Sequence, residues 1–95
     1  MNVARPLDIP VQRHPRVVWR AFDDEIAIVA PWAGQVHTLT DVAARCWELA
    51  DGRTVEQIME VLLQEFDVEP EVLRKDLEEF LDELDKRKLL EWAGE

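Results

Sequence analysis

Three short segments between residues 16 and 39 are strand-like, and turn-forming residues separate them. The segments 16–22 (RVVWRAF) and 25–30 (EIAIVA) are rich in β-branched and aromatic residues, and the turn-forming pair Asp23-Asp24 separates them. We therefore expect a β-hairpin. Residues 31–34 (PWAG) suit a tight turn, because proline restricts φ and glycine accepts a positive φ. Segment 35–39 follows as a third antiparallel strand at the edge of the sheet.

Apolar positions spaced by three and four residues predict helices after this sheet. The first helix begins after Thr40, whose hydroxyl group is expected to cap the N-terminus. Asp41 adds negative charge at the positive end of the helix dipole. Gly52 suits a left-handed C-terminal cap, so we expect this helix to end there.

Two further helices follow the same spacing. Residues 55–66 form the second, and Thr54 with Gln57 three residues later matches a capping box. Residues 70–86 form the third, which opens with a proline at a position where the missing amide proton costs nothing. The last apolar residues, which pack back onto the core or add a short strand, are Leu89, Leu90 and Trp92.

Residues 1–15 contain three prolines and no sustained periodicity, so we expect an extended or partly disordered N-terminal arm. Residues 16–95 then form one domain, as the length of 95 residues suggests. Three strands followed by three helices predict an α+β fold, with the helices packed on one face of a small three-stranded antiparallel sheet. The same order of elements also describes a winged helix-turn-helix.

The charge of the chain limits its partners. Lys and Arg number 11 against 21 Asp and Glu, a formal net charge of −10. Contacts from Lys and Arg to phosphate supply most non-specific affinity for nucleic acid, so this charge argues against nucleic acid as a partner. No apolar segment is long enough to span a membrane, residues 1–15 lack the apolar core of a secretory signal, and the single cysteine, Cys46, fits a reducing compartment. We expect a cytoplasmic protein without a membrane partner, present as a monomer or weak homodimer.

The sequence lacks the residue patterns typical of catalytic and metal sites. Its two histidines, His14 and His37, and its one cysteine match no zinc motif. The chain has no glycine-rich loop for phosphate and no serine. Carboxylate pairs such as Glu78-Glu79 are typical of a solvated helix face in so acidic a chain. The sequence therefore predicts a protein that is not an enzyme and uses no cofactor and no metal.

Two residues near the third strand fit either a structural or a binding role. Alternation places Gln35 and His37 on the same face as the apolar residue Leu39. Either the strand is irregular, or His37 lies on the core side of the sheet and is partly buried. An ordinary strand histidine and a ligand contact both fit this position. Trp32 in the preceding turn either folds over the sheet or is exposed as an apolar contact for a partner.

Several short matches to a known family occur in a fixed order, none of them a sharp motif: Arg13, Pro15, Pro31, 34–39, Thr40, Ala43-Ala44, Asp51-Gly52, 55–58, Asp76-Leu77 and Leu89-Leu90. In this order they resemble the PqqD family, the small elements that recognise precursor peptides in pathways that mature ribosomally made peptides. The resemblance covers about residues 13–92. The family often has asparagine at Thr40, which is also a helix-capping residue, and glycine at Lys88, so the geometry after the third helix is open.

The resemblance implies a non-catalytic peptide chaperone. Such a protein binds the leader of a precursor peptide and presents it to a modifying enzyme, typically a radical S-adenosylmethionine (SAM) protein. Pyrroloquinoline quinone (PQQ) biosynthesis and another peptide pathway both fit. The exposed third strand agrees with this role, because an extended peptide can pair with an open sheet edge as an additional strand.

The third helix is expected to form the wall beside that peptide. We favour its flank with Val72, Asp76 and Glu79 over the flank with Arg74 and Glu78, because Val72 extends the apolar surface. Arg74 and Lys75 are cations able to attract an acidic leader. The expected peptide-binding residues are Gln35, Val36, His37, Thr38, Leu39, Val72, Lys75, Asp76 and Glu79.

Two other functions fit the same elements. A winged helix-turn-helix that binds DNA needs a basic recognition helix, whereas residues 70–86 are rich in Asp and Glu. A homo-oligomeric interaction domain would pair the third strand with a second copy of itself, and the mass in solution distinguishes that case.

Overall fold

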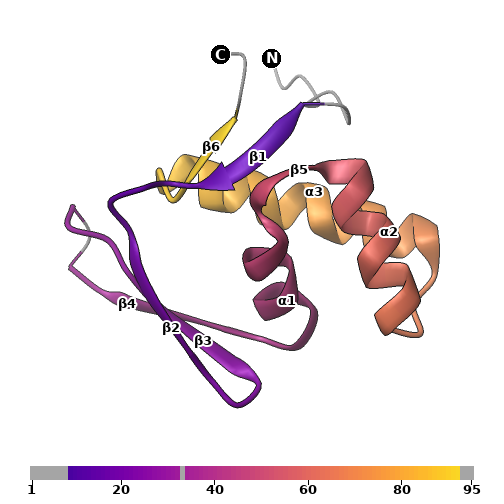
Figure 1. The fold of residues 1–95 in the computed structure, drawn as a ribbon, viewed down its shortest axis with the longest axis horizontal. Helices are drawn as coiled ribbons and strands as arrows, with labels where there is room; N and C mark the ends of the chain where they lie inside the picture. Colours follow the sequence, from indigo (N-terminus) through magenta and orange to yellow (C-terminus); the bar gives the residue numbers. More distant parts are fainter. Residues whose placement is uncertain (1–8, 33, 93–95) are drawn as a thin grey trace.

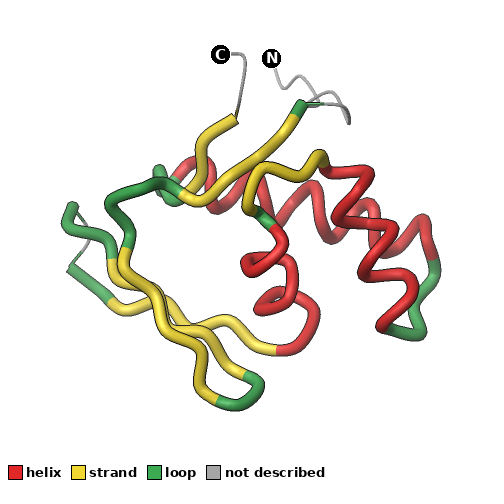
Figure 2. The backbone as a smooth tube through the Cα atoms, viewed as in Figure 1, coloured by secondary structure: helices red, strands yellow, loops and turns green. Residues whose placement is uncertain are grey.

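The computed structural model describes residues 9–32 and 34–92, which fold into two small antiparallel sheets and three helices (Figures 1 and 2). This architecture confirms the α+β class and adds a second sheet to it. The elements in chain order are β1 (Pro10–Arg13), β2 (Val18–Phe22), β3 (Glu25–Val29), β4 (Val36–Thr40), α1 (Asp41–Leu49), β5 (Asp51–Thr54), α2 (Val55–Glu65), α3 (Pro70–Lys86) and β6 (Leu90–Trp92).

The expected three-stranded sheet is present, in the order β2-β3-β4. Its hairpin pairs Phe22 with Glu25 across the two-residue turn, and Asp23 in this turn has a φ of 51°. Aspartate tolerates this left-handed conformation better than most residues. β3 also pairs with β4, from Val29↔Val36 to Glu25↔Thr40. β4 therefore lies at one edge of the sheet, as predicted.

The second sheet, in the order β5-β1-β6, places part of the expected N-terminal arm inside the fold. Residues 10–13 are extended, as expected, but they form the middle strand of this sheet. Gln12 pairs with Asp51 on one side and with Glu91 on the other, and Val11 has no exposed surface. Both partners lie far away in the sequence, so no local pattern indicated this pairing. Residues 1–8 of the expected arm lie outside the described residues.

The second and third helices follow the predicted bounds closely. In α2, the Thr54 hydroxyl accepts a hydrogen bond from the Gln57 amide at 3.1 Å, and the Gln57 side chain accepts one from the Thr54 amide at 2.9 Å. The predicted capping box is therefore confirmed. Leu73, Leu77, Leu81 and Leu84 form the buried stripe of α3, four residues or fewer apart on one face.

Neither predicted cap of the first helix forms. Thr40 occupies the N-cap position, but its side chain makes no capping hydrogen bond. Asp41 follows with a φ of 53°, so the first turn lacks the helical backbone that would bring an amide to the hydroxyl. At the other end, the C-cap is Ala50, and Gly52 lies in β5 with a φ of 109°. Glycine is used there for the irregular pairing of β5 with β1.

An arginine from β1 supplies the missing C-terminal cap of α1. The Nη1 atom of Arg13 donates hydrogen bonds to the carbonyl oxygens of Trp47 and Glu48, both at 2.9 Å. Its guanidinium carbon also lies 4.9 Å from the centre of the Trp19 ring in β2. Arg13 thus satisfies the Glu48 carbonyl, adds a second donor to the Trp47 carbonyl, which also accepts from the Ala50 amide at 3.2 Å, and connects the two sheets.

The end of α3 has the geometry of a Schellman motif. The Leu89 amide donates to the Leu84 carbonyl at 2.9 Å, and the Lys88 amide donates to the Asp85 carbonyl at 3.0 Å. Lys88 has a φ of 62°. This is the left-handed position at which glycine carries no steric penalty.

α1 lies between the two sheets and carries the centre of the core (Figure 1). Trp47 and Cys46 are almost completely buried, and the Trp47 ring meets the Trp19 ring edge-on. A bidentate pair joins α1 to α2, with Arg45 Nε 2.8 Å from Glu65 Oε1 and Arg45 Nη2 2.9 Å from Glu65 Oε2. Among the described residues, no helix has the length and apolar content needed to cross a membrane.

Candidate functional site

The outer edge of β4 is open. Within the described residues, β4 pairs with β3 on one side and with no strand on the other. A two-residue turn joins the paired residues Phe22 and Glu25, so hydrogen-bonded and non-hydrogen-bonded pairs alternate from that point across the sheet. By this alternation the backbone groups of His37 and Leu39 point toward β3. Those of Val36 and Thr38 point away from it, where they are available to another strand.

The side chains of β4 alternate regularly. Val36 is 61% exposed and Thr38 is also exposed, whereas His37 and Leu39 are partly buried. Of the two possibilities left open by the sequence, the structure therefore shows a regular strand with a partly buried His37. The exposed side chains lie on the outer face of the sheet, away from the core.

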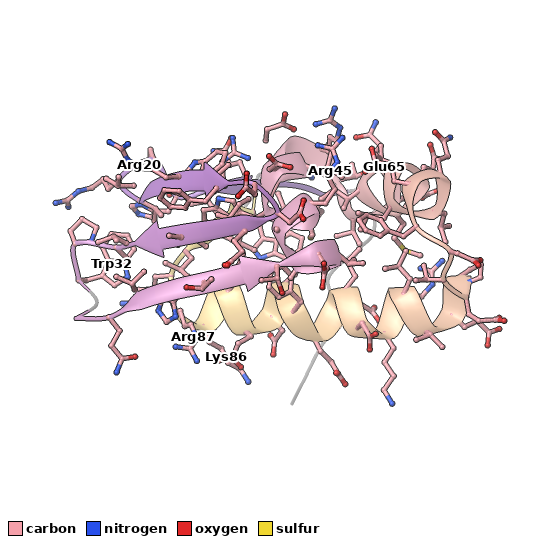
Figure 3. All side chains as sticks on the ribbon, turned by 90° about the horizontal axis from the view of Figure 1, so that it is seen from below. Arg20, Trp32, Arg45, Glu65, Lys86 and Arg87 are labelled. Atoms are coloured by element: carbon pink, nitrogen blue, oxygen red, sulfur yellow. The ribbon has the colours of Figure 1, made fainter. Side chains whose placement is uncertain are left out.

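α3 follows β4 as the next element when the molecule is viewed from below (Figure 3). Two cavities flank this arrangement at opposite ends of α3. We call the open edge of β4, the neighbouring side of α3 and these two cavities the β4–α3 face. The flank of α3 that was favoured from the sequence contributes to it, since Val72 and Asp76 line one of the cavities.

The first cavity is apolar and lies between α1 and the first half of α3. Its volume is about 250 Å³, which is enough for one large apolar side chain. Asp76 contributes the one charged side chain of its lining. The lining residues are Val42, Ala43, Cys46, Val68, Val72, Leu73, Asp76, Leu77 and Phe80.

Most of the apolar cavity was missed from the sequence because its residues have the spacing of core positions. Val42, Ala43 and Cys46 belong to the apolar face of the first helix, and Phe80 to that of the third. Burial raises the pKa of the Cys46 thiol to about 12. The thiol therefore stays protonated at neutral pH and acts as an apolar surface rather than as a nucleophile.

The second cavity is wider and basic, and it lies at the other end of α3. It has a volume of about 710 Å³ and is bounded by the first residues of β4 and the last residues of the helix. Three consecutive cations face it from the helix side. Its lining residues are Trp32, Gly34, Gln35, His37, Lys86, Arg87 and Lys88.

The cations of the basic cavity were not among the predicted site residues. At the level of the sequence, Lys86, Arg87 and Lys88 are the cations that favour the negative end of a helix dipole. Their position opposite Gln35 and His37 depends on how α3 packs, which the local pattern does not contain.

The predicted site residues are thus only partly brought together. Val72 and Asp76 line the apolar cavity, Gln35 and His37 line the basic one, and Val36 and Thr38 supply the open edge. Leu39 packs against the core. Lys75 and Glu79 are exposed on α3 and line neither of the two cavities.

Trp32 folds back onto the protein and remains partly exposed. Its Nε1 atom donates a hydrogen bond to the Arg87 carbonyl oxygen at 3.0 Å, and its ring meets the His14 ring edge-on at 4.6 Å. The side chain is nevertheless 41% exposed and borders the basic cavity. Its position is therefore compatible with both roles considered from the sequence, packing over the sheet and apolar contact with a partner. In the described part of the chain, no group of three or more His, Cys, Asp or Glu residues is placed to hold a metal ion.

Comparison with protein families identifies the chain. A family model described as "Coenzyme PQQ synthesis protein D (PqqD)" matches residues 25–90, more than half of the sequence. The chain belongs to the PqqD family. In this PqqD-family chain, the matched residues include every residue that lines the two cavities.

A solved structure similar to this PqqD-family chain is that of TbiB1 in complex with the TbiA(beta) leader peptide. The TM-score is 0.78 and the sequence identity is 30%, over 84% of this chain and 94% of the matched chain. Comparison with curated protein sequences finds no significant match.

Proposed function

We propose that this protein is a non-catalytic adaptor that binds the leader of a ribosomally made precursor peptide. The observation that carries the proposal is the open edge of β4 between two cavities. An extended peptide pairs with the backbone groups of Val36 and Thr38 and adds a fourth strand to the sheet β2-β3-β4. The similar protein TbiB1, solved with a leader peptide, supports this use of the fold.

The two parts of the face contribute differently to binding. Each main-chain hydrogen bond contributes a net ~0.5–1.5 kcal/mol and does not depend on the peptide's sequence. An apolar side chain that enters the cavity between α1 and α3 contributes ~1.5–3 kcal/mol. Strand pairing thus supplies affinity, and the cavity supplies selectivity for a leader with a large apolar residue.

The partner that we propose for the loaded adaptor is a radical SAM enzyme that modifies the precursor peptide. The PQQ pathway, named in the description of the family, is one such setting, and another peptide-modifying pathway fits equally well. The site offers binding groups rather than reactive ones, since the buried Cys46 thiol is protonated at neutral pH. The chemistry therefore belongs to the enzyme, in a soluble cytoplasmic complex.

A DNA-binding role is not supported by the charge of α3. The exposed side of this helix carries Glu71, Glu78 and Asp82 in addition to Asp76 and Glu79. These carboxylates would repel a phosphate backbone, and the net charge of −10 acts in the same direction.

The test begins by reading the neighbouring genes for a short precursor peptide, whose leader is then titrated into ¹⁵N-labelled protein. We expect the largest amide shifts at Val36, His37 and Thr38 and along the cavity side of α3. Shifts confined to β2 and β3 would contradict the proposal. A rise to twice the monomer mass without peptide would indicate that β4 pairs with a second copy instead.

Two proline variants separate strand addition from general damage. Val36→Pro removes an outward-facing donor from β4, and Ala21→Pro removes the corresponding donor from β2, the other edge of the same sheet. We expect similar losses of stability, but loss of peptide binding only in Val36→Pro. The same variant should fail to promote modification of that peptide by the proposed radical SAM partner. Equal binding by both variants would rule out pairing at β4.

A further inference from the structure

The β4–α3 face has charges of opposite sign at its two ends. Asp76 borders the apolar cavity, whereas Lys86, Arg87 and Lys88 border the basic one. In a chain with 11 cationic and 21 anionic residues, three consecutive cations at the end of one groove are a local exception. A bound peptide that follows β4 would meet both ends.

The cations differ in how strongly they are already paired. Lys86 Nζ lies 3.3 Å from Asp82 and Arg87 Nε lies 3.0 Å from Glu83, in pairs one helical turn apart whose side chains are all about half exposed or more. Such exposed pairs are weak and exchange readily with another carboxylate. Lys88 has no ion pair within the described part of the chain, and its side chain faces the cavity opposite Gln35 and His37.

The backbone at Lys88 gives an independent reason to assign it a role. Its φ of 62° lies in the left-handed region, which is unfavourable for a lysine and free of strain for glycine. Residues held in such conformations are often retained for function. The helix dipole explains cations in the last turn of α3 but does not explain a lysine at a left-handed position, where glycine would stabilise the fold.

We propose that the basic cavity recognises an acidic side chain of the leader peptide and that Lys88 determines this preference. The inference rests on the proposed function and specifies its ligand. The leader carries a large apolar residue for the cavity between α1 and α3 and an Asp or Glu for the basic cavity. The two are roughly five residues apart, since β4 has five residues and an extended peptide advances ~3.3 Å per residue.

The test begins with a phage-displayed library of random 12-residue peptides selected on the wild-type protein. Enriched sequences should share the apolar and acidic residues at this separation. The best peptide is then synthesised with its acidic residue intact and with the corresponding Asn or Gln. We expect the acidic form to bind at least threefold more tightly at low salt, and the difference to vanish at high salt.

Variants of the protein then identify the residue that causes the preference for the acidic peptide. Lys88→Gly should remove the preference for the acidic peptide while raising Tm, because the strain is relieved, and Lys88→Arg should retain the preference. Opposite changes in binding and stability are not expected of a merely structural residue. Arg20→Gln, on β2 at the far side of the sheet (Figure 3), is the matched control for loss of one positive charge and should keep the preference.

Several outcomes would overturn the inference. Peptides that shift the amides of β4 but show no acidic preference would overturn it and leave the proposed function intact. Loss of the preference in Lys75→Gln but not in Lys88→Gly would transfer it to the lysine expected from the sequence. Failure to enrich any peptide, or shifts confined to β2 and β3, would count against the inference and the proposed function together.

Discussion

The indole Nε1 of Trp32 donates a hydrogen bond to the carbonyl oxygen of Arg87 at 3.0 Å. Trp32 belongs to the turn before β4, and Arg87 is the C-cap residue of α3. This bond therefore holds together the two elements that bound the basic cavity. It also satisfies a carbonyl group that the end of the helix leaves unpaired.

The first prediction concerns this bond. Trp32→Phe keeps an aromatic ring beside His14 but removes the donor, so we expect a loss of about 1 kcal/mol in unfolding free energy. Urea denaturation measures this loss, and faster hydrogen exchange in β4 should accompany it. Phe22→Leu, which changes another exposed aromatic residue without removing a hydrogen bond, serves as the control. Equal stability of both variants would mean that the bond contributes nothing.

The second prediction concerns Arg13. Arg13→Gln removes the charged group that donates to two carbonyl oxygens of α1 and lies over the Trp19 ring. We expect a loss of about 2 kcal/mol, because hydrogen bonds from charged groups are stronger than neutral ones and the substitution removes two of them. Arg16→Gln removes an exposed arginine nearby and should change stability by less than ~0.5 kcal/mol. Thermal unfolding of the two variants under the same conditions measures the two losses of stability.

The third prediction compares one substitution at two neighbouring positions. Lys88→Gly should stabilise the protein by about 1 kcal/mol, because glycine adopts the observed φ of 62° without strain. Lys86→Gly should destabilise it by at most ~1 kcal/mol, because that residue is the last of α3, where glycine is a poorer helix former, and it loses its pair with Asp82. Chemical denaturation gives both values. The same sign at both positions would show that the backbone conformation of Lys88 is not strained.

The fourth prediction concerns pH. Hydrogen bonds from Arg45 lower the pKa of the Glu65 carboxyl group below its ordinary value. A lowered pKa in the folded state stabilises the protein at pH values above the unfolded pKa, and this contribution is lost as the pH falls through the folded pKa. An NMR titration should therefore show Glu65 titrating at lower pH than in Arg45→Gln. Glu60→Gln, on the same helix, should leave the Glu65 titration unchanged.

Local patterns in the sequence were sufficient for the elements whose hydrogen bonds are local. The capping box at Thr54 and Gln57, the stripe of α3 and the hairpin around Asp23-Asp24 were predicted where the structure has them. The second sheet was not predicted, because its strands are short and its pairs, such as Gln12 with Glu91, join distant segments. The C-terminal cap of α1 failed for the same reason, since a side chain from β1 replaces the local cap that Gly52 suggested, whereas the N-terminal cap is lost to the positive φ of Asp41.

The candidate site was predictable on its strand side and, on the helix side, at Val72 and Asp76. The exposure of β4 follows from alternation and from its position at the end of a meander. The two cavities depend instead on how α3 packs against α1 and approaches β4. Phe80 and Cys46 therefore looked like ordinary core residues, and Lys88 looked like an ordinary helix end. The left-handed backbone conformation of Lys88 is apparent only from the structure.

The pairing of Val11 with Trp92 brings the beginning of β1 and the end of β6 to one place, away from β4 (Figure 1). The segment between these two residues thus begins and ends on neighbouring strands of one sheet. A host protein joined at either of these residues, or one that carries this segment as an insertion, would attach on the side away from β4. Engineers who wish to bring a chosen peptide to a new enzyme have, in this geometry, a natural point of attachment.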